Sequence, residues 1–282
     1  MSTSQLTVGE VVRRTTTYFA DAGSPSPRLD ADLVMSHSLR MTRLELYTEF
    51  DRPLSADELA HARELVARRG RREPMAYILG SRAFRRLELE VTPAVLVPRP
   101  ETEVLVEWVM EVAVPRANIL DWGTGSGAIA LALKDERPDC EITAVDISAD
   151  ALEVAQANAT RLGLDVTFRQ SDGCDGCADA SMDVIAANPP YLSEDELTNA
   201  PRELSYEPRG ALVGGPRGDE VITVLAAQAA RVLVPGGMLV CEIGASQAES
   251  VSKIFTTAGL VNVQVRKDLA GNVRVVAAQC PE

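Results

Sequence analysis

Apolar residues recur at helical spacing through the first part of the chain, in segments with recognisable starts. Thr7 stands three residues before Glu10, and Ser55 stands three residues before Glu58, so each pair is a capping box in front of an apolar face. Pro27 suits the first turn of another helix, where its missing N–H would have no partner. These features predict a small helical bundle as a first domain over residues 1–83.

The pattern changes to a period of two in the segment 84–100. Leu87, Leu89 and Val91 alternate with glutamates, and prolines punctuate the positions that follow. Such alternation is typical of a half-buried strand, and prolines favour extended chain. We therefore expect a β-hairpin linker over 84–100, followed by a second domain over 101–282.

Short apolar runs then alternate with amphipathic helical patterns, which favours a mostly parallel sheet covered by helices on both faces, an α/β fold. Only residues 267–271 separate the last two strands, too few for a crossover helix, so we expect them to be antiparallel. The predicted strands are 118–122, 141–146, 165–169, 182–187, 237–243, 260–266 and 272–279, and the predicted helices are 126–135, 149–162, 217–234 and 246–258.

Charge is unevenly distributed along the 282 residues, whose formal net charge is −13. Residues 1–84 carry 12 arginines and 11 acidic residues, whereas the remainder carries 16 basic and 30 acidic residues. An acidic body repels phosphate backbones, so we expect no high-affinity binding to DNA or RNA.

The first domain holds a cluster of arginines at positions 68, 69, 71 and 72. The plainer interpretation is a solvated helix end. The alternative is a surface that meets an acidic or RNA-bearing partner.

Neither membrane insertion nor secretion is predicted. The longest apolar candidate, Val221–Ala230, contains Gln228 and falls short of the ~18 residues that span a bilayer. Met1–Glu10 has neither the basic start nor the apolar core of a secretory signal. We expect a cytoplasmic protein with no membrane partner.

The five cysteines lie mostly in apolar contexts, as reduced thiols do. Cys174 and Cys177 form a Cys-x2-Cys pair, but a zinc site needs further ligands, and neither His37 nor His61 has ligand spacing. We expect no metal and interpret the pair as part of a turn.

A glycine-rich turn, Asp121-Trp-Gly-Thr-Gly-Ser-Gly127, follows a predicted strand and opens a helix. Its glycines permit positive φ and let a ligand approach the backbone closely. Asp146 ends the next strand, where a carboxylate can accept both ribose hydroxyl protons of a nucleoside. The alternative for Asp146 is to cap the next helix, which Ser148 could do instead.

NAD and S-adenosylmethionine both suit this arrangement. The Gly-x-Gly-x-Gly spacing and the lack of groups for a pyrophosphate favour S-adenosylmethionine, which has no phosphate. An acidic surface also suits its sulfonium cation.

Asn188-Pro-Pro-Tyr191 follows a predicted strand and therefore lies at the carboxyl edge of the sheet. The prolines fix the backbone and remove two donors, so the Asn188 side-chain oxygen and the Pro189 carbonyl can both accept protons from one NH2 group. Tyr191 offers a flat face for a planar group. The alternative interpretation is a plain turn after a strand.

These groups suit methyl transfer to an amide nitrogen. Such a nitrogen is a poor nucleophile because its lone pair is delocalised, and two acceptors on its hydrogens favour charge developing on it. No general base is required, because the proton can leave after transfer. The predicted catalytic residues are Asn188, Pro189 and Tyr191.

Several segments occur together in one order along the chain: Arg72-Glu-Pro-Met-Ala-Tyr-Ile-Leu-Gly80, Val97-Pro-Arg-Pro-Glu-Thr-Glu103, the glycine turn, Asn188-Pro-Pro-Tyr191 and Glu242-Ile-Gly244. With them, the chain resembles the PrmC/HemK family of protein-glutamine N5-methyltransferases over essentially its full length. Asn-Pro-Pro-Tyr alone is shared with adenine-N6 methyltransferases, whereas the first two segments are far more specific.

The resemblance implies a class I S-adenosylmethionine-dependent methyltransferase, Rossmann-like, with a seven-stranded sheet whose last strand is antiparallel, plus the helical bundle. It implies methylation of the glutamine in the Gly-Gly-Gln loop of class I peptide chain release factors, with S-adenosylhomocysteine as product and the bundle gripping the release factor. The alternative is a paralogue that uses the same clamp on another planar nitrogen, in a small molecule or adenine.

The resemblance also assigns residues. The glutamine amide would be held by Asn188, Pro189, Pro190 and Tyr191, with the segment from Pro100 to Thr102 closing over the site. The implied cofactor contacts are Gly123, Thr124, Gly125, Ser126, Gly127, Asp146, Asp172, Gly173, Asn188, Glu101 and Thr102.

Three positions depart from the family, one of which is Val273, where an acidic residue is usual. Gly173 stands where an aromatic residue is common, and Trp122 stands where a smaller aliphatic residue is common. We therefore expect the adenine to contact only the backbone at position 173, or to contact a side chain from another position.

Overall fold

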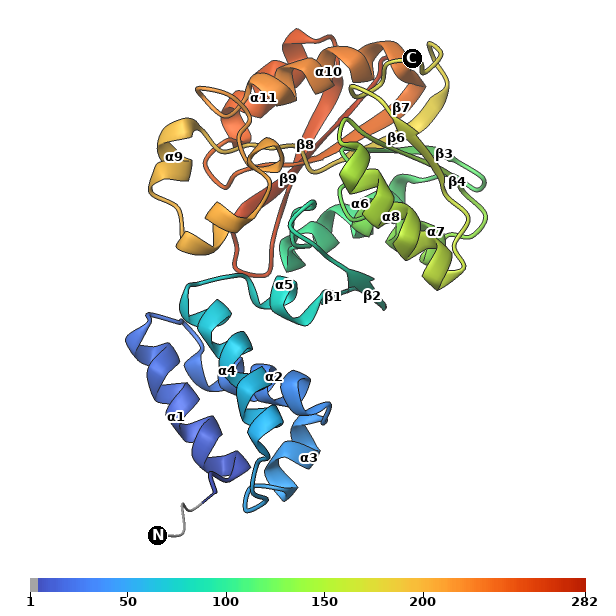
Figure 1. The fold of residues 1–282 in the computed structure, drawn as a ribbon. Coiled ribbons are helices and arrows are strands. Elements are labelled where there is room, and N and C mark those ends of the chain that lie inside the picture. Colours follow the sequence, from blue (N-terminus) through green and yellow to red (C-terminus); the bar gives the residue numbers. More distant parts are fainter. Residues whose placement is uncertain (1–4) are drawn as a thin grey trace. The chain divides into compact units, whose positions relative to one another are not determined.

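The computed structural model describes residues 5–282, so the first four residues of the predicted bundle and of the segment assessed as a secretory signal lie outside it. The chain forms two compact units (Figure 1). One, the helical unit, contains the chain up to Gly80 together with Pro201–Tyr206, and the other, the sheet unit, contains Ser81–Ala200 and Glu207–Glu282. The sequence patterns do not indicate that Pro201–Tyr206 joins the first unit. Among the described residues no helix is both long and apolar enough to cross a membrane.

The helical unit confirms the predicted bundle. Both capping boxes are complete, with the side chains of Thr7 and Ser55 accepting from the N–H groups of Glu10 and Glu58 and those glutamates accepting in return. Pro27 begins its helix as expected. The elements are α1 (Val8–Asp21), α2 (Pro27–Leu39), α3 (Arg43–Thr48), α4 (Ala56–Gly70), α5 (Met75–Leu79) and the 3-10 helix η2 (Arg202–Tyr206).

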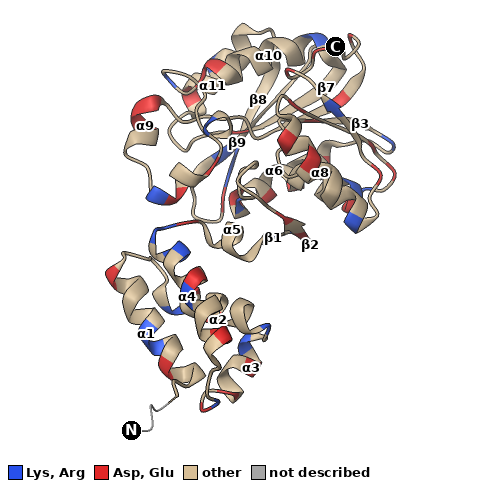
Figure 2. Cartoon of the chain, in the orientation of Figure 1, with Lys and Arg blue, Asp and Glu red and all other residues tan. Residues whose placement is uncertain are grey.

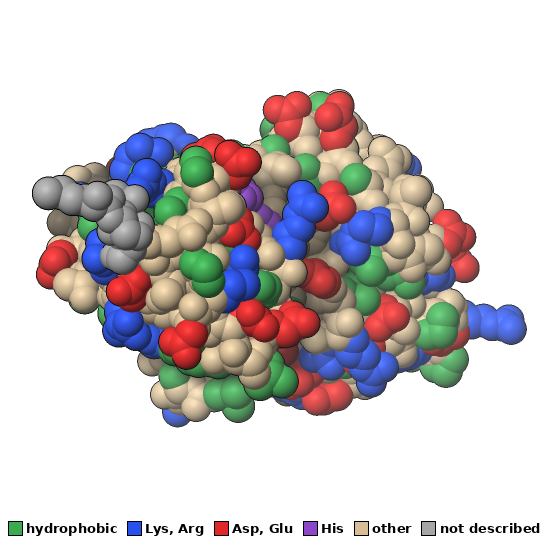
Figure 3. Space-filling view, turned by 60° about the horizontal axis from the view of Figure 1, so that its bottom comes forward, with side chains coloured by type: hydrophobic (Ala, Val, Ile, Leu, Met, Phe, Trp, Pro, Cys, Tyr) green, Lys and Arg blue, Asp and Glu red, His purple; other side chains and the backbone are tan. Residues whose placement is uncertain are grey.

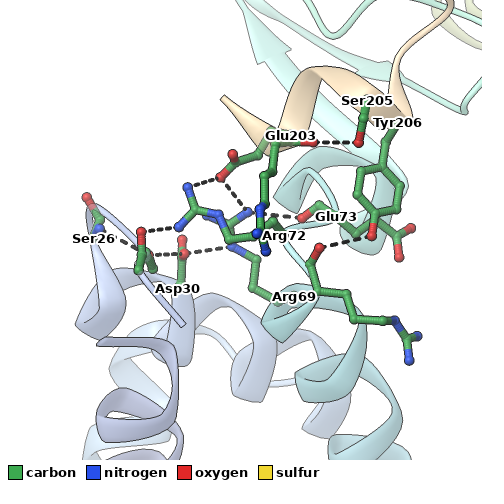
Figure 4. Close-up of polar contacts among 12 residues, drawn as sticks. Ser26, Asp30, Arg69, Arg72, Glu73, Glu203, Ser205 and Tyr206 are labelled. Carbon is green, nitrogen blue, oxygen red and sulfur yellow. Dashed lines mark hydrogen bonds and ion pairs between the residues drawn. The ribbon is translucent and has the colours of Figure 1, made fainter. Parts of the chain in front are cut away.

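The arginines at the end of α4 are mostly paired with acidic side chains, and Arg69 is buried, so the expectation of a solvated helix end is wrong for Arg69. Its side chain is 7% exposed, and its Nε donates to Asp30 Oδ2 over 2.7 Å. Glu203 of η2 pairs with Arg69 over 3.3 Å and with Arg72 over 2.5 Å (Figure 4). We call these four residues the arginine clasp. Because Glu203 is more than a hundred positions away in the chain, local patterning gave no sign of it.

Tyr206 ties the other end of η2 to the same helix end. Its hydroxyl donates to the carbonyl of Arg71 over 3.0 Å (Figure 4). Arg71 is the exposed member of the cluster, whereas Arg68 pairs with Glu73 over 2.5 Å.

The sheet unit begins with a hairpin, β1 (Ser81–Phe84) and β2 (Leu87–Glu90), whose first strand precedes the segment in which a hairpin was expected. A seven-stranded sheet follows, in the order β5-β4-β3-β6-β7-β9-β8. Its strands are β3 (Asn118–Trp122), β4 (Glu141–Asp146), β5 (Thr167–Gln170), β6 (Met182–Ala187), β7 (Leu233–Glu242), β8 (Val261–Lys267) and β9 (Val273–Gln279). The strands from β3 to β7 are parallel, and β9 is antiparallel to both β7 and β8, as predicted.

The helices of the sheet unit follow the prediction with shifted ends. The predicted helix 217–234 is shorter, because a glycine turn ending at Gly218 precedes it and β7 already begins at Leu233. The elements are η1 (Pro100–Thr102), α6 (Glu103–Val112), α7 (Ala128–Glu136), α8 (Ala149–Leu162), α9 (Glu194–Thr198), η3 (Arg209–Ala211), α10 (Glu220–Val232) and α11 (Ala248–Thr257).

Helices cover both faces of the sheet, and consecutive residues of β3 show why. Ile119 packs into one core cluster with residues of α6 and α7, whereas Leu120 packs into another with residues of α10 and α11. Side chains alternate between faces along a strand, so a strand buried on both faces has a continuous run of apolar residues.

Acidic and basic positions are interspersed on the surface elements (Figure 2), and the face in Figure 3 mixes charged and hydrophobic side chains.

This topology brings the sequence motifs together. β3 lies between β4 and β6, with Trp122 in register with Val145 on one side and with Ala187 on the other. The glycine turn, Asp146 and Asn188 therefore follow neighbouring strands at one edge. The chain order reverses direction across β3, which is where open α/β sheets bind ligands.

Candidate functional site

A cavity of about 340 Å³ lies at this edge of the sheet unit. Its volume falls within the ~300–1,000 Å³ typical of small-molecule sites. The predicted site residues that line it are Thr102, Gly123, Thr124, Gly125, Ser126, Asp146, Asp172, Gly173, Asn188 and Pro190. Glu101, Gly127, Pro189 and Tyr191 adjoin these residues in the chain without lining the cavity.

The glycine turn is built for close approach of a ligand. Gly123 and Gly125 have φ of +74° and +54°, and a β-carbon added at either would meet no atom within 4 Å. Their backbone conformation, rather than crowding by the protein, therefore requires glycine. Gly127 differs, because a β-carbon there would lie 2.9 Å from Leu131 and 3.3 Å from Ala155, so it allows α7 and α8 to pack.

Asp121 anchors this turn from below. Its Oδ2 accepts from Thr124 Oγ1 over 2.7 Å and from the N–H of Ala130 over 3.1 Å. The side chain is fully buried, and this burial raises its pKa to about 7 against the lowering effect of the hydrogen bond from Thr124. Among residues 5–282 no donor reaches its Oδ1.

Asp146 faces the cavity, while Ser148 caps α8. Asp146 Oδ2 accepts from the N–H of Gly125 over 2.8 Å, and Asp146 Oδ1 accepts from the N–H of Ser148 over 2.9 Å. Ser148 itself accepts from the N–H of Ala151 over 3.2 Å, so the α8 N-cap does not need the carboxylate. Since each carboxylate oxygen has a second lone pair, Asp146 can still accept hydrogen bonds from two hydroxyl groups.

Trp122 fills the space beside Gly173. The indole Nε1 donates to Gln228 Oε1 over 3.0 Å, and the same oxygen accepts from the N–H of Cys174 over 2.9 Å. Both Trp122 and Gly173 line the cavity, so an indole from β3 forms this wall next to a bare backbone. Across the described residues no group of three or more His, Cys, Asp or Glu could hold a metal ion.

Asn188 is held by a buried relay of hydrogen bonds. Its Nδ2 donates to Thr102 Oγ1 over 3.2 Å, and Thr102 Oγ1 donates to Glu242 Oε2 over 2.6 Å. The hydroxyl of Tyr191 lies 3.5 Å from the other oxygen of Glu242, at the limit of hydrogen bonding. Burial raises the pKa of Tyr191 to about 12, with a further contribution from Glu242, so the phenol stays protonated.

The loop after Tyr191 is fixed by backbone pairing. The N–H of Leu192 donates to the carbonyl of Leu212 over 2.9 Å, and the N–H of Gly214 donates to the carbonyl of Leu192 over 3.0 Å. Gln247 Nε2 donates to the carbonyl of Tyr191 over 2.9 Å. Within residues 5–282 no backbone N–H donates to the Pro189 carbonyl, and Pro189 is buried between Asn188 and Pro190, which line the cavity.

Sequence reasoning missed several residues at this site. Glu207, whose side chain is 1% exposed, accepts from Arg99 over 2.5 Å and from the N–H of Val97 over 3.1 Å, and so holds the segment 97–99, of which Pro98 and Arg99 line the cavity. Only its tertiary position identifies it. Ile147 also lines the cavity although it is 68% exposed, and an apolar residue directly after Asp146 in a polar turn was a readable signal.

Comparison with family models finds two matches along the chain. The PrmC N-terminal domain matches residues 10–80, and the methyltransferase small domain matches residues 100–213. The first corresponds to the helical unit and the second to the part of the sheet unit that carries the cavity.

Similar curated proteins extend over nearly the whole chain. A release factor glutamine methyltransferase of Geobacter sulfurreducens is 39% identical over 97% of this chain and 96% of its own length. Proteins of the same name from Rhodopirellula baltica and Koribacter versatilis are 41% identical over 97% and 45% identical over 92% of this chain, covering 96% and 94% of their own lengths.

Solved structures support the fold alone. A methyltransferase from Pyrococcus furiosus matches with a TM-score of 0.55 and 22% identity, over 70% of this chain and 90% of that one. A 16S rRNA methyltransferase from T. thermophilus, solved with AdoMet and guanosine, matches with a TM-score of 0.51 and 21% identity, over 71% of this chain and 49% of that one. The fold is that of a class I S-adenosylmethionine-dependent methyltransferase.

Proposed function

Because the chain belongs to the release factor glutamine methyltransferase family, we propose that it methylates the side-chain nitrogen N5 of the glutamine in the Gly-Gly-Gln motif of class I peptide chain release factors. The methyl donor is S-adenosyl-L-methionine. The product is a secondary amide at a residue used in translation termination, so the modification would tune that step. One observation carries the proposal: the glycine turn and Asn188 line the same cavity.

The residues of this cavity fit S-adenosylmethionine. The turn containing Gly123 and Gly125 leaves open space where side chains would stand, and Asp146 keeps free lone pairs for ribose hydroxyls. The wall of Asp172, Gly173 and Trp122 would border the adenine. When bound, this group supplies a methyl carbon made electrophilic by a sulfonium.

The clamp would prepare the acceptor nitrogen. Asn188 Oδ1 and the Pro189 carbonyl would each accept a hydrogen bond from the glutamine NH2 group. These bonds favour positive charge on that nitrogen as its lone pair localises. Tyr191 would support the flat amide, and the segment around Thr102 would close the site. Holding the nitrogen in line with the methyl carbon can account for up to ~7–11 kcal/mol of the barrier. The extra proton leaves after transfer, so no base is needed.

The charge of the chain after residue 84 supports a protein acceptor. The chain from residue 85 onward carries 16 basic and 30 acidic residues, which disfavours tight binding to a phosphate backbone. We place the protein in the cytoplasm, where translation occurs.

The direct test is to incubate the protein with labelled S-adenosylmethionine and a purified class I release factor, and to map the methylated residue by mass spectrometry. We expect one methyl group on the glutamine of Gly-Gly-Gln and none on a release factor whose glutamine is replaced by alanine. Label on an adenine or small molecule instead, with the release factor unmodified, would contradict the proposal and favour the paralogue.

A further inference from the structure

Glu242 is a buried carboxylate connected to the Asn188 amide by two hydrogen bonds. It accepts from Thr102 Oγ1 over 2.6 Å, and Thr102 Oγ1 accepts from Asn188 Nδ2 over 3.2 Å. Glu242 is 1% exposed and does not line the cavity. Any effect that it has on a bound substrate must therefore pass through Thr102 or another neighbour.

The direction of these bonds follows from the number of protons available. A threonine hydroxyl has one proton, and an ionised carboxylate can only accept, so the proton of Thr102 points to Glu242. The lone pairs of Thr102 Oγ1 then face Asn188, which must present its NH2 group to them. The amide oxygen of Asn188 is thereby left on the other side, and within residues 5–282 no protein donor engages it.

We propose that Glu242 is a positioning residue that holds the Asn188 amide in one orientation through the Thr102 hydroxyl, with Oδ1 toward the acceptor nitrogen. The inference rests on the proposed function, because only an acceptor that carries N–H groups needs an oxygen there. In the reversed orientation Asn188 would present a donor to a donor, and the clamp would keep only one acceptor.

This positioning of Asn188 depends on the negative charge of Glu242. Burial raises the pKa of this carboxyl to about 7, against the lowering effect of the hydrogen bond from Thr102. A protonated Glu242 can donate to Thr102, whose own proton then becomes free to meet the Asn188 oxygen. Both amide orientations become accessible, so acid would weaken the clamp.

Three titratable or charged groups face Glu242 from the elements around it, and Cys241 precedes it in β7. Arg274 of β9 favours the carboxylate, and Glu101 of η1 opposes it. Tyr191 donates toward it from the loop after β6, and Cys241, its neighbour in β7, is a buried thiol whose own pKa is raised by burial and by Glu242. Tyr191 and Asn188 therefore both depend on the same carboxylate.

Matched variants separate positioning from simple structural support. Thr102→Val removes the hydroxyl with little change of shape, Thr102→Ser keeps it, and Glu242→Gln keeps the shape but can donate as well as accept. For the full-length protein, kcat and KM with a purified release factor are measured from pH 6 to pH 8.5. The affinity for S-adenosylmethionine and the Tm are measured in parallel.

We expect Thr102→Val to lower kcat by about 10- to 100-fold, with the affinity for S-adenosylmethionine changed less than about 3-fold, and Thr102→Ser to restore kcat to near the wild-type value. The ratio of wild-type to Glu242→Gln kcat should be about 10 at pH 8.5 and approach one at pH 6.

Three results would overturn the inference: a wild-type kcat in Thr102→Val, an equal loss in Thr102→Ser, or a ratio that does not change with pH. In each case the wild-type protein would still methylate the glutamine, so the proposed function would stand. A wild-type protein that leaves the glutamine unmodified would contradict both.

Discussion

A β-carbon on Gly173 would overlap the indole Nε1 of Trp122. The same β-carbon would overlap Oε1 of Gln228, which accepts hydrogen bonds from Trp122 and from the N–H of Cys174. The position of the Trp122 side chain therefore requires that residue 173 have no side chain.

Gly173→Ala should lower the free energy of unfolding by about 1–3 kcal/mol, because of overpacking as well as a φ of +61°. Gly176→Ala is the matched control, since Gly176 in the same loop has φ of +76° but no atom within 4 Å of an added β-carbon. Denaturant unfolding of both variants, and of Gly173→Ala combined with Trp122→Leu, measures the steric part. Equal losses in the two alanine variants, or no rescue by Trp122→Leu, would show that the indole does not exclude a side chain.

Asp146→Ala should weaken binding of S-adenosylmethionine by about 10- to 100-fold, because it removes the acceptor for ribose hydroxyls and the hydrogen bond that orients Gly125. Isothermal titration calorimetry measures this loss. Asp150→Ala, which removes an exposed carboxylate in the first turn of α8, should leave the affinity unchanged. Similar affinities in the two variants would mean that Asp146 does not bind the nucleoside.

Asp121→Asn should change how stability depends on pH. Folding raises the pKa of Asp121 from 3.8 to about 7, so the wild-type protein loses stability from this group as pH rises through that interval, and the loss is complete above it. The Tm of the variant relative to wild type should therefore increase from pH 5 to pH 8, while Glu242 contributes equally to both proteins. A Tm difference that is the same at both pH values would contradict the buried, proton-binding state of Asp121.

Glu203→Ala should cost about 2 kcal/mol of stability, because it leaves buried Arg69 with Asp30 as its one remaining carboxylate partner and leaves Arg72 without its carboxylate. Glu194→Ala, which breaks an exposed pair with Arg209 in the same region of the chain, should cost less than about 0.5 kcal/mol. Denaturant unfolding of the full chain compares them. A loss in Glu203→Ala no larger than in Glu194→Ala would show that the arginine clasp does not stabilise the fold.

Local patterns predicted most of the fold because its elements carry local signals. The capping boxes at Thr7 and Ser55, the position of Pro27 and the alternation of strands with helices all depend on residues a few positions apart. The short connection before β9 likewise required an antiparallel pair. Where the prediction failed, long-range contacts decide. Arg69 is buried and pairs with Asp30 and Glu203, and no window around α4 contains either residue.

The same distinction applies to the candidate site. Local patterns identified the glycine turn, Asp146 and Asn188, because the carboxyl ends of the strands of a parallel sheet lie at one edge. The support behind them could not be found in this way. Glu207 and the link from Thr102 to Glu242 join segments more than a hundred positions apart, and nothing local marks a glutamate that will be buried.

The claim that Asn188 clamps the acceptor nitrogen opposite the methyl donor is tested most directly by single-turnover methyl transfer from S-adenosylmethionine to a purified release factor by Asn188→Ala. Asn199→Ala, an exposed asparagine of the following loop, is the control. We predict a rate at least about 100-fold below wild type for Asn188→Ala, with the affinity for S-adenosylmethionine within about 3-fold of wild type. A wild-type rate in Asn188→Ala would contradict the account.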